Sequence, residues 1–190
     1  MTTAPPERID LASSDDSERE LVLRWVTVDD AEAVALAVSE SLEHLKPWMP
    51  WADARSADPA FQRSRLRTQA QQRERGEEWQ YGLFRTDGAD APLLGAFGLM
   101  TRRGPRTLEI GYWLHVDAGA NGYATRAARA LTRAGLHVDD VDRMIIVCDE
   151  ANLRSAAIPR RLGYTLDRVD TRAPEAPGET GRMQMWTLTR

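Results

Sequence analysis

The 190-residue chain is mildly acidic, because 29 aspartates and glutamates outnumber 25 lysines and arginines and give a net charge of −4 at pH 7. This balance argues against general affinity for nucleic acid or for an anionic membrane surface. The length fits one domain, and no stretch approaches the roughly 18 to 20 apolar residues that span a bilayer.

The chain contains one cysteine, Cys148, so it cannot form an internal disulfide, which fits a reducing compartment. Cys148 follows the apolar run Met144–Val147, and this setting favours a buried structural thiol over a nucleophile. No cluster of His, Cys and carboxylates has the spacing of metal ligands, so we expect no metal site. Since the N-terminal segment lacks a signal-peptide core, we expect a cytoplasmic protein.

The N-terminal region is polar over residues 1–18 and contains Pro5-Pro6 and an acidic run. We expect a flexible arm there, followed by a single domain over residues 19–190. Leu21–Trp25 predicts the first strand. Apolar residues then recur every three or four positions and predict an amphipathic helix: Val34, Val38, Leu42 and Leu45.

Pro47 and Pro50 end this helix and place Trp48 and Trp51 on a loop. Two tryptophans within four loop residues indicate either one wall of a ligand cleft or a packed structural plug. Asp58-Pro59 then begins a polar helix. Its arginines interleave with glutamine and are most simply a solvated face, with binding of an acidic partner as the alternative: Arg63, Arg65, Arg67, Arg73 and Arg75.

The rest of the chain alternates strands and helices. Two antiparallel strands joined by a turn at Asp87-Gly88 are followed by a strand over residues 107–116 and a helix over residues 122–137. The remaining predicted elements are a strand at Arg143–Cys148, a helix at Leu153–Leu162 and a last strand at Met183–Leu188. This order predicts a mixed α/β domain.

The stretch from Glu109 to Ala128 is the centre of this organisation. Its apolar and aromatic first half predicts a strand buried on both faces, and its Ala-rich second half opens a helix. Between them stand small residues that allow a phosphate close to the backbone: Gly119, Ala120, Gly122 and Ala124. Because the first turn of a helix has unpaired N–H groups and a positive dipole end, this turn is a candidate phosphate cradle. An ordinary strand-to-helix turn is an equally good interpretation of the turn alone.

Two pairs of motifs carry a resemblance to a known family. Glu109–His115 and Asn121–Thr125 resemble the E-I-G-Y-W-L-H strand and the G-x-G-Y-A-T loop of the RimJ/RimL-like branch of the GNAT N-acetyltransferase superfamily. Asn152–Ser155, with Leu162-Gly163-Tyr164 farther on, resembles the N-x-x-S…L-G-F/Y signature of that branch. The pyrophosphate motif of the superfamily falls on residues 119–124, where Gly119 and Ala120 depart from the usual residues.

The resemblance implies a mixed, largely antiparallel sheet of about seven strands, splayed in the middle and flanked by about four helices. It implies acetyl-CoA or another acyl-CoA as co-substrate, without a metal. The cofactor-binding residues implied are Leu114, His115, Val116, Gly119, Ala120, Asn121, Gly122, Tyr123, Ala124, Thr125, Asn152 and Ser155. Trp48, Trp51 and Tyr112 are placed on the acceptor side. The acceptor is a primary amine of a protein N-terminus or a small molecule, and the protein is a monomer or a homodimer.

Proton transfer is assigned to two residues. Glu109, at the start of the central strand, is the predicted base, with a solvent-facing strand-end carboxylate as the alternative. Many members of the superfamily protonate the leaving thiolate with a tyrosine at the position of Pro159, so Ser155 is predicted to do so here. Pro159 also removes the N–H that would bond the Ser155 carbonyl, which predicts a freed carbonyl at the site. For His115, a structural loop role is favoured over catalysis.

The predicted function is acyl transfer from acetyl-CoA by direct attack of the amine in a ternary complex. The alternative is a non-catalytic acyl-CoA-binding or regulatory module of the same fold, which Gly119 and Ala120 at the altered motif positions favour.

Overall fold

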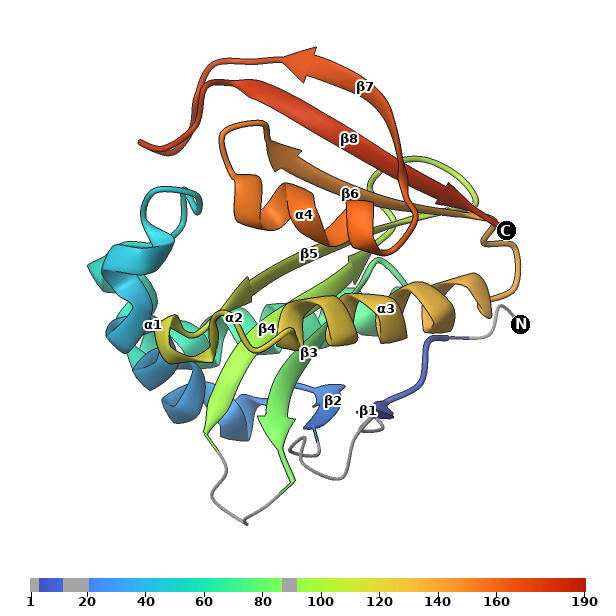
Figure 1. Cartoon of the computed structure of the whole chain (residues 1–190). Coiled ribbons are helices and arrows are strands. Elements are labelled where there is room, and N and C mark those ends of the chain that lie inside the picture. The colour runs from blue at the N-terminus through green and yellow to red at the C-terminus, as the bar shows by residue number, and fades with distance from the viewer. Residues whose placement is uncertain (1–3, 12–20, 87–91) are drawn as a thin grey trace.

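The computed structural model describes residues 4–11, 21–86 and 92–190, which form one eight-stranded sheet in the order β1-β2-β3-β4-β5-β6-β8-β7 (Figure 1). The pairs are antiparallel except for β5 and β6, which are parallel. The strands are β1 (Arg8–Leu11), β2 (Leu21–Trp25), β3 (Glu78–Arg85), β4 (Leu93–Met100), β5 (Thr107–Leu114), β6 (Arg143–Asp149), β7 (Thr165–Thr171) and β8 (Arg182–Thr189).

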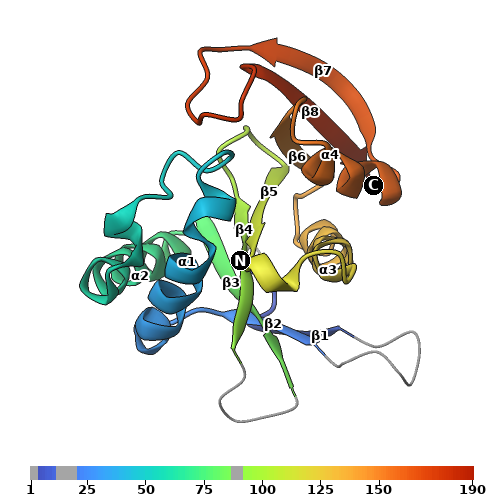
Figure 2. The ribbon, with the colours of Figure 1, turned by 60° about the vertical axis from the view of Figure 1, so that its left-hand side comes forward.

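Helices cover both faces of this sheet. They are α1 (Ala31–Leu45), α2 (Pro59–Glu74), α3 (Tyr123–Leu136) and α4 (Leu153–Arg161), with short 3₁₀ turns η1 (Val28–Asp30), η2 (Ala54–Ala57) and η3 (Val116–Ala118). Figure 2 shows α1 and α2 on one side of β3 and β4, and α3 on the other. The predicted mixed fold with about four helices is therefore confirmed.

Alternating side chains divide the core into two layers. Tyr81 and Phe97 belong to the layer that packs against α3 and α4, and both are fully buried. Phe84 and Trp113 belong to the layer that packs against α1. This is the period-two pattern expected of strands buried on both faces.

The sheet divides between β5 and β6. The two strands pair from Thr107 and Arg143 only as far as Ile110 and Ile146. Beyond that point β5 stays paired with β4 up to Leu114, while β6 stays paired with β8 along its whole length. Figure 1 shows the two strands diverging. The predicted splay in the middle of the sheet is thus confirmed.

Two strands were not expected from the sequence. The prediction of a flexible arm is wrong for Arg8–Leu11, which pairs with β2 as an edge strand. Leu11 is buried there, and the Tyr81 hydroxyl donates a hydrogen bond to the Pro6 carbonyl at 2.8 Å. The rest of the predicted arm, apart from residues 4–7, lies outside the described residues, as does the predicted turn at Asp87-Gly88.

The second unexpected strand is β7, the opposite edge of the sheet. Most of its residues are exposed, so it lacks the apolar alternation by which a strand is found in a sequence. With β1 and β7 the sheet has eight strands instead of about seven.

Candidate active site

The strand β5 ends two residues earlier than predicted, where it meets α1. The His115 N–H donates to the Leu94 carbonyl at 2.9 Å, and the Val116 N–H donates to the Ser41 hydroxyl at 3.1 Å. Successive residues of a strand point their backbone groups in opposite directions, so Leu114 directs its N–H and C=O away from β4, into the splay. Val116 is among the residues expected to bind the coenzyme, but its N–H is used by Ser41.

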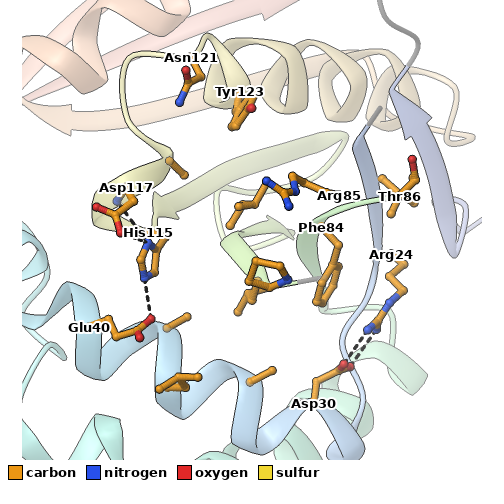
Figure 3. Close-up of a pocket in the computed structure, with 18 of the residues that line it drawn as sticks. Arg24, Asp30, Glu40, Phe84, Arg85, Thr86, His115, Asp117, Asn121 and Tyr123 are labelled. Carbon is orange, nitrogen blue, oxygen red and sulfur yellow. Dashed lines mark hydrogen bonds and ion pairs between the residues drawn. The ribbon is translucent and has the colours of Figure 1, made fainter. Parts of the chain in front are cut away.

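His115 fixes this turn through both ring nitrogens. Its Nε2 lies 3.0 Å from Glu40 Oε2 on α1, and its Nδ1 accepts the Asp117 N–H at 3.2 Å (Figure 3). The ring therefore caps η3 and attaches it to α1, in agreement with the structural role favoured from the sequence. A contact of His115 with the coenzyme stays a prediction.

A cavity of about 1170 Å³ opens beside the turn, between α1 and the start of α3 (Figure 3). Asn121 and Tyr123 line it from the side of α3, and Glu40 lines it from α1. The Asn121 side-chain amide donates to the Gly119 carbonyl at 3.0 Å, which keeps the turn compact.

The N-terminus of α3 has no side-chain cap. Its N-cap residue is Gly122, with a φ of 72°, and a Cβ built there would meet nothing within 4 Å. Ala120 also has a positive φ, of 64°. The backbone N–H groups of residues 119–125 donate to no other described residue. Exposed free N–H groups at a helix start, without side chains in front of them, fit a phosphate-bearing ligand.

The N-terminus of α4 lies across the splay and is capped. The Asn152 side-chain oxygen accepts the Ser155 N–H at 3.1 Å, whereas the NH₂ group of Asn152 donates to no described residue. The oxygen of Asn152 thus stabilises the helix while its amide donors stay available to a ligand.

Ser155 bonds to Tyr112 across the splay. The Tyr112 hydroxyl lies 3.0 Å from Ser155 Oγ and donates to the Ser155 carbonyl at 3.2 Å. This carbonyl is the one freed by Pro159, which lies within α4 as predicted. Burial raises the pKa of Tyr112 far above its usual range, although the bond to Ser155 opposes this shift, so the phenol keeps its proton. Tyr112 and Ser155 thereby join β5 to α4 where β5 and β6 part.

Glu109 is buried, with a side chain only 4% exposed, so the alternative of a solvent-facing carboxylate is wrong. It forms ion pairs with Arg102, at 2.5 Å, and with Arg103. Burial alone would raise the pKa of Glu109, but the hydrogen bonds and charges of the two arginines outweigh it and lower the pKa below its usual value. Glu109 is therefore ionised at neutral pH.

A second cleft, of about 650 Å³, brings together most of the predicted catalytic and acceptor residues. Trp48 and Trp51 line it from the loop after α1, and the Trp51 ring contacts the Trp113 ring edge-on at 6.1 Å. The tryptophan loop is thus a wall of a cleft. The other predicted site residues in its lining are Glu109, Tyr112, Asn152 and Ser155. Cys148 lines it too, and burial raises the pKa of its thiol to about 11, as expected of an inert cysteine.

Arg102, Arg103 and Arg172 line this cleft as well and were not predicted as site residues, whereas Arg65 was expected on a solvated face. Arg102 and Arg103 follow β4 in a turn, and no periodic pattern connects them to Glu109. No group of three or more His, Cys, Asp or Glu residues suited to a metal ion occurs within residues 4–11, 21–86 and 92–190. In the same ranges, no helix is long and apolar enough to cross a membrane.

Comparisons with known proteins agree with this geometry. The family model described as "Acetyltransferase (GNAT) domain" matches residues 20–165. YdaF of Bacillus subtilis (strain 168), whose name describes it as a candidate ribosomal N-acetyltransferase, is 24% identical over 151 residues, which are 76% of this chain and 77% of YdaF.

Solved structures share the fold at low identity. The ribosomal L7/L12 alpha-N-protein acetyltransferase RimL, in complex with coenzyme A, superposes with a TM-score of 0.80 at 19% identity, over 95% of this chain and 98% of RimL. The microcin C7 self-immunity acetyltransferase MccE, in complex with acetyl-CoA and AMP, gives a TM-score of 0.81 at 19% identity, over 95% of this chain and 98% of MccE. Mycobacterium smegmatis RimJ, in complex with a CoA-disulfide, gives a TM-score of 0.79 at 19% identity, over 90% of this chain and 82% of RimJ.

Proposed function

This chain belongs to the GNAT acetyltransferase family, and on that premise we propose that it transfers an acyl group from acetyl-CoA to a primary amine in a ternary complex. The observation that carries the proposal is the uncapped N-terminus of α3 beside the splay between β5 and β6. The helix N-terminus suits the phosphates of the coenzyme, and the splay beside it leaves room for its extended arm.

The coenzyme is assigned to the turn and the splay. The free N–H groups of residues 119–125 receive the pyrophosphate, and Gly122 leaves the backbone accessible. The backbone of Leu114 and the Asn152 amide face the pantetheine arm. The coenzyme supplies the acyl group as a thioester, whose carbonyl becomes more negative as the amine attacks and is stabilised by N–H donors.

The acceptor is assigned to the cleft lined by Trp48 and Trp51. A protein amine is favoured because RimL is an alpha-N-protein acetyltransferase and YdaF is named for ribosomal substrates. The cleft opens on the side of the sheet that packs α1 and α2, while Tyr112 and Ser155 face it through the splay. An amine and a thioester can thus approach the same gap from two sides.

Two groups manage the protons. Glu109 is ionised and can accept the proton of the amine, directly or through water, although its low pKa reduces the driving force of this transfer. The Ser155 hydroxyl is assigned to the departing thiolate. Tyr112, 3.0 Å from Ser155 Oγ, orients this hydroxyl.

The test is coenzyme A release from acetyl-CoA with a panel of peptides and small amines, beside a titration of coenzyme binding. Glu109→Gln should lower kcat about 10²- to 10⁴-fold, the range for a lost general base, and leave coenzyme affinity nearly unchanged. A kcat of Glu109→Gln within a few-fold of the wild-type value at every pH would show that Glu109 is not the base. Binding of coenzyme by the wild type without turnover of any amine would instead support the non-catalytic module.

A further inference from the structure

Arg65 differs from Arg63 and Arg67, its neighbours on α2. Arg63 forms an ion pair with Glu32 at the surface, and Arg67 is exposed. Arg65 is partly buried and lines the cleft beside Trp51, so the expectation of a wholly solvated arginine face is wrong at this position.

The guanidinium of Arg65 has no carboxylate partner within ion-pair distance among the described residues. Its one hydrogen bond is from Nη1 to the Gln62 side-chain oxygen, at 3.3 Å, and its Cζ lies 5.7 Å from the Trp51 ring. Burial lowers the pKa of Arg65, and the negative charge of Glu78 offsets only part of this decrease. A desolvated cation without a carboxylate in direct contact is costly, and an incoming anion that makes this contact would relieve that cost.

The other arginines of the cleft are already neutralised. Arg102 and Arg103 pair with Glu109, as described above. Arg172, on the opposite wall, pairs with Glu175 at 3.2 Å and with Glu179 at 2.9 Å. Within the described part of the cleft, Arg65 is thus the guanidinium left for a ligand.

Arg65 lies within reach of the splay. Ring contacts of 5.7 Å and 6.1 Å lead from its guanidinium through Trp51 to Trp113 on β5. The guanidinium and the Trp113 ring are therefore no farther apart than about 12 Å, close to the span of three extended residues, roughly 10 Å. An acceptor with its amine at the splay can bring a carboxylate two or three residues away to Arg65.

We propose that Arg65 binds a carboxylate carried by the acceptor, so that the protein prefers amines with an acidic group at this spacing. The planar guanidinium suits a carboxylate through paired hydrogen bonds, and the Trp51 ring beside it restricts its orientation. Two sources share this chemistry, namely a peptide N-terminus with Asp or Glu at its second or third residue and a small amino acid of similar length. This inference rests on the proposed function.

The experiment compares matched acceptors that differ only in charge. Acetyl-CoA turnover is measured with C-terminally amidated tripeptides that carry Glu or Gln at the third residue, and with an ω-amino acid and its amide. Wild type should prefer the acid over the amide in kcat/KM by about tenfold or more within at least one pair, because hydrogen bonds to charged groups are the stronger class. Arg65→Gln should reduce this ratio to about one, mainly through the KM of the acid.

Arg67→Gln is the matched control, since it removes a neighbouring charge outside the cleft and should keep the wild-type ratio. Arg65→Lys keeps the charge but not the paired geometry, so its ratio should fall between those of wild type and Arg65→Gln. This variant also tests the inference if Arg65→Gln does not fold.

The outcomes separate the two levels of the proposal. A preference for the acidic peptide would identify a peptide N-terminus as the acceptor, and a preference for the ω-amino acid would identify a small amino acid as the acceptor. Turnover without any preference in wild type, or with an equal preference in Arg65→Gln, overturns the inference and leaves the acyltransferase standing. Absence of turnover with every amine overturns the proposed function itself.

Discussion

The helices α3 and α4 both begin beside the gap between β5 and β6, yet their N-termini are built in opposite ways. At α4 the Asn152 side chain caps the helix by accepting the Ser155 N–H. At α3 Gly122 provides no side chain, and the N–H groups before and after it stay free among the described residues. One helix satisfies its own first turn, whereas the other leaves it for a ligand.

In the proposed function, this difference gives one sheet two kinds of contact with the coenzyme. The α3 terminus offers the positive dipole end and several N–H donors, which suit phosphate. The α4 terminus offers the amide donors of Asn152, which suit the neutral arm of the coenzyme. Changing each terminus separately should therefore affect affinity and stability in different proportions.

Gly122→Val should have the largest effect, a loss of coenzyme A affinity of about 100-fold or more, because several charge-assisted hydrogen bonds are lost together. A φ of 72° is unfavourable for a β-branched residue, and the new side chain stands where the phosphates approach. Isothermal titration calorimetry measures this loss. Gly76→Val is the matched control, because Gly76 has a φ of 69° and an equally open Cβ position. Gly76 follows α2 and lies away from the first turn of α3.

Replacement of Asn152 should separate capping from binding. Asn152→Asp retains the cap but removes the amide donors, so coenzyme affinity should fall about tenfold while the protein stays as stable as wild type. Asn152→Ala should lose the same affinity and, in addition, about 1 kcal/mol of unfolding free energy. Calorimetry and urea unfolding give the two quantities. Equal affinity of wild type and Asn152→Asp would limit Asn152 to its cap.

Ala120→Gly should produce the smallest change, a gain of about 0.5 kcal/mol in stability. Ala120 has a φ of 64°, which costs an L-residue about 1 to 2 kcal/mol, and the greater freedom of glycine in the unfolded chain cancels part of the relief. Coenzyme affinity should not change, because the N–H groups keep their directions. If urea unfolding showed that Ala120→Gly is less stable than wild type, Ala120 would not be strained in the native protein.

The sequence was most informative where a pattern is local. β5 and α3 were predicted because an apolar strand, a glycine turn and an Ala-rich helix follow one another within about twenty residues. The link between Pro159 and a freed Ser155 carbonyl follows from proline chemistry alone, and Tyr112 accordingly donates to that carbonyl.

What the sequence could not supply depends on contacts between distant segments. The edge strand β7 has exposed side chains and is held by its pairing with β8. The arginines around Glu109 come from a turn, and the polar helix α2 gives no periodic sign that Arg65 faces a cleft while Arg67 faces solvent. The bond of the Val116 N–H to Ser41 has no local sequence sign, because Ser41 is 75 residues away.

The central claim is that the free N–H groups between Gly119 and Thr125 hold the phosphates of coenzyme A. Titration of the ¹⁵N-labelled protein with coenzyme A, followed by the backbone amide resonances, tests it directly. The account predicts saturable shifts that are largest for residues 119–125 and include Leu114 and the Asn152 side-chain amide. Shifts confined to other parts of the protein, with residues 119–125 unchanged at saturation, would contradict it.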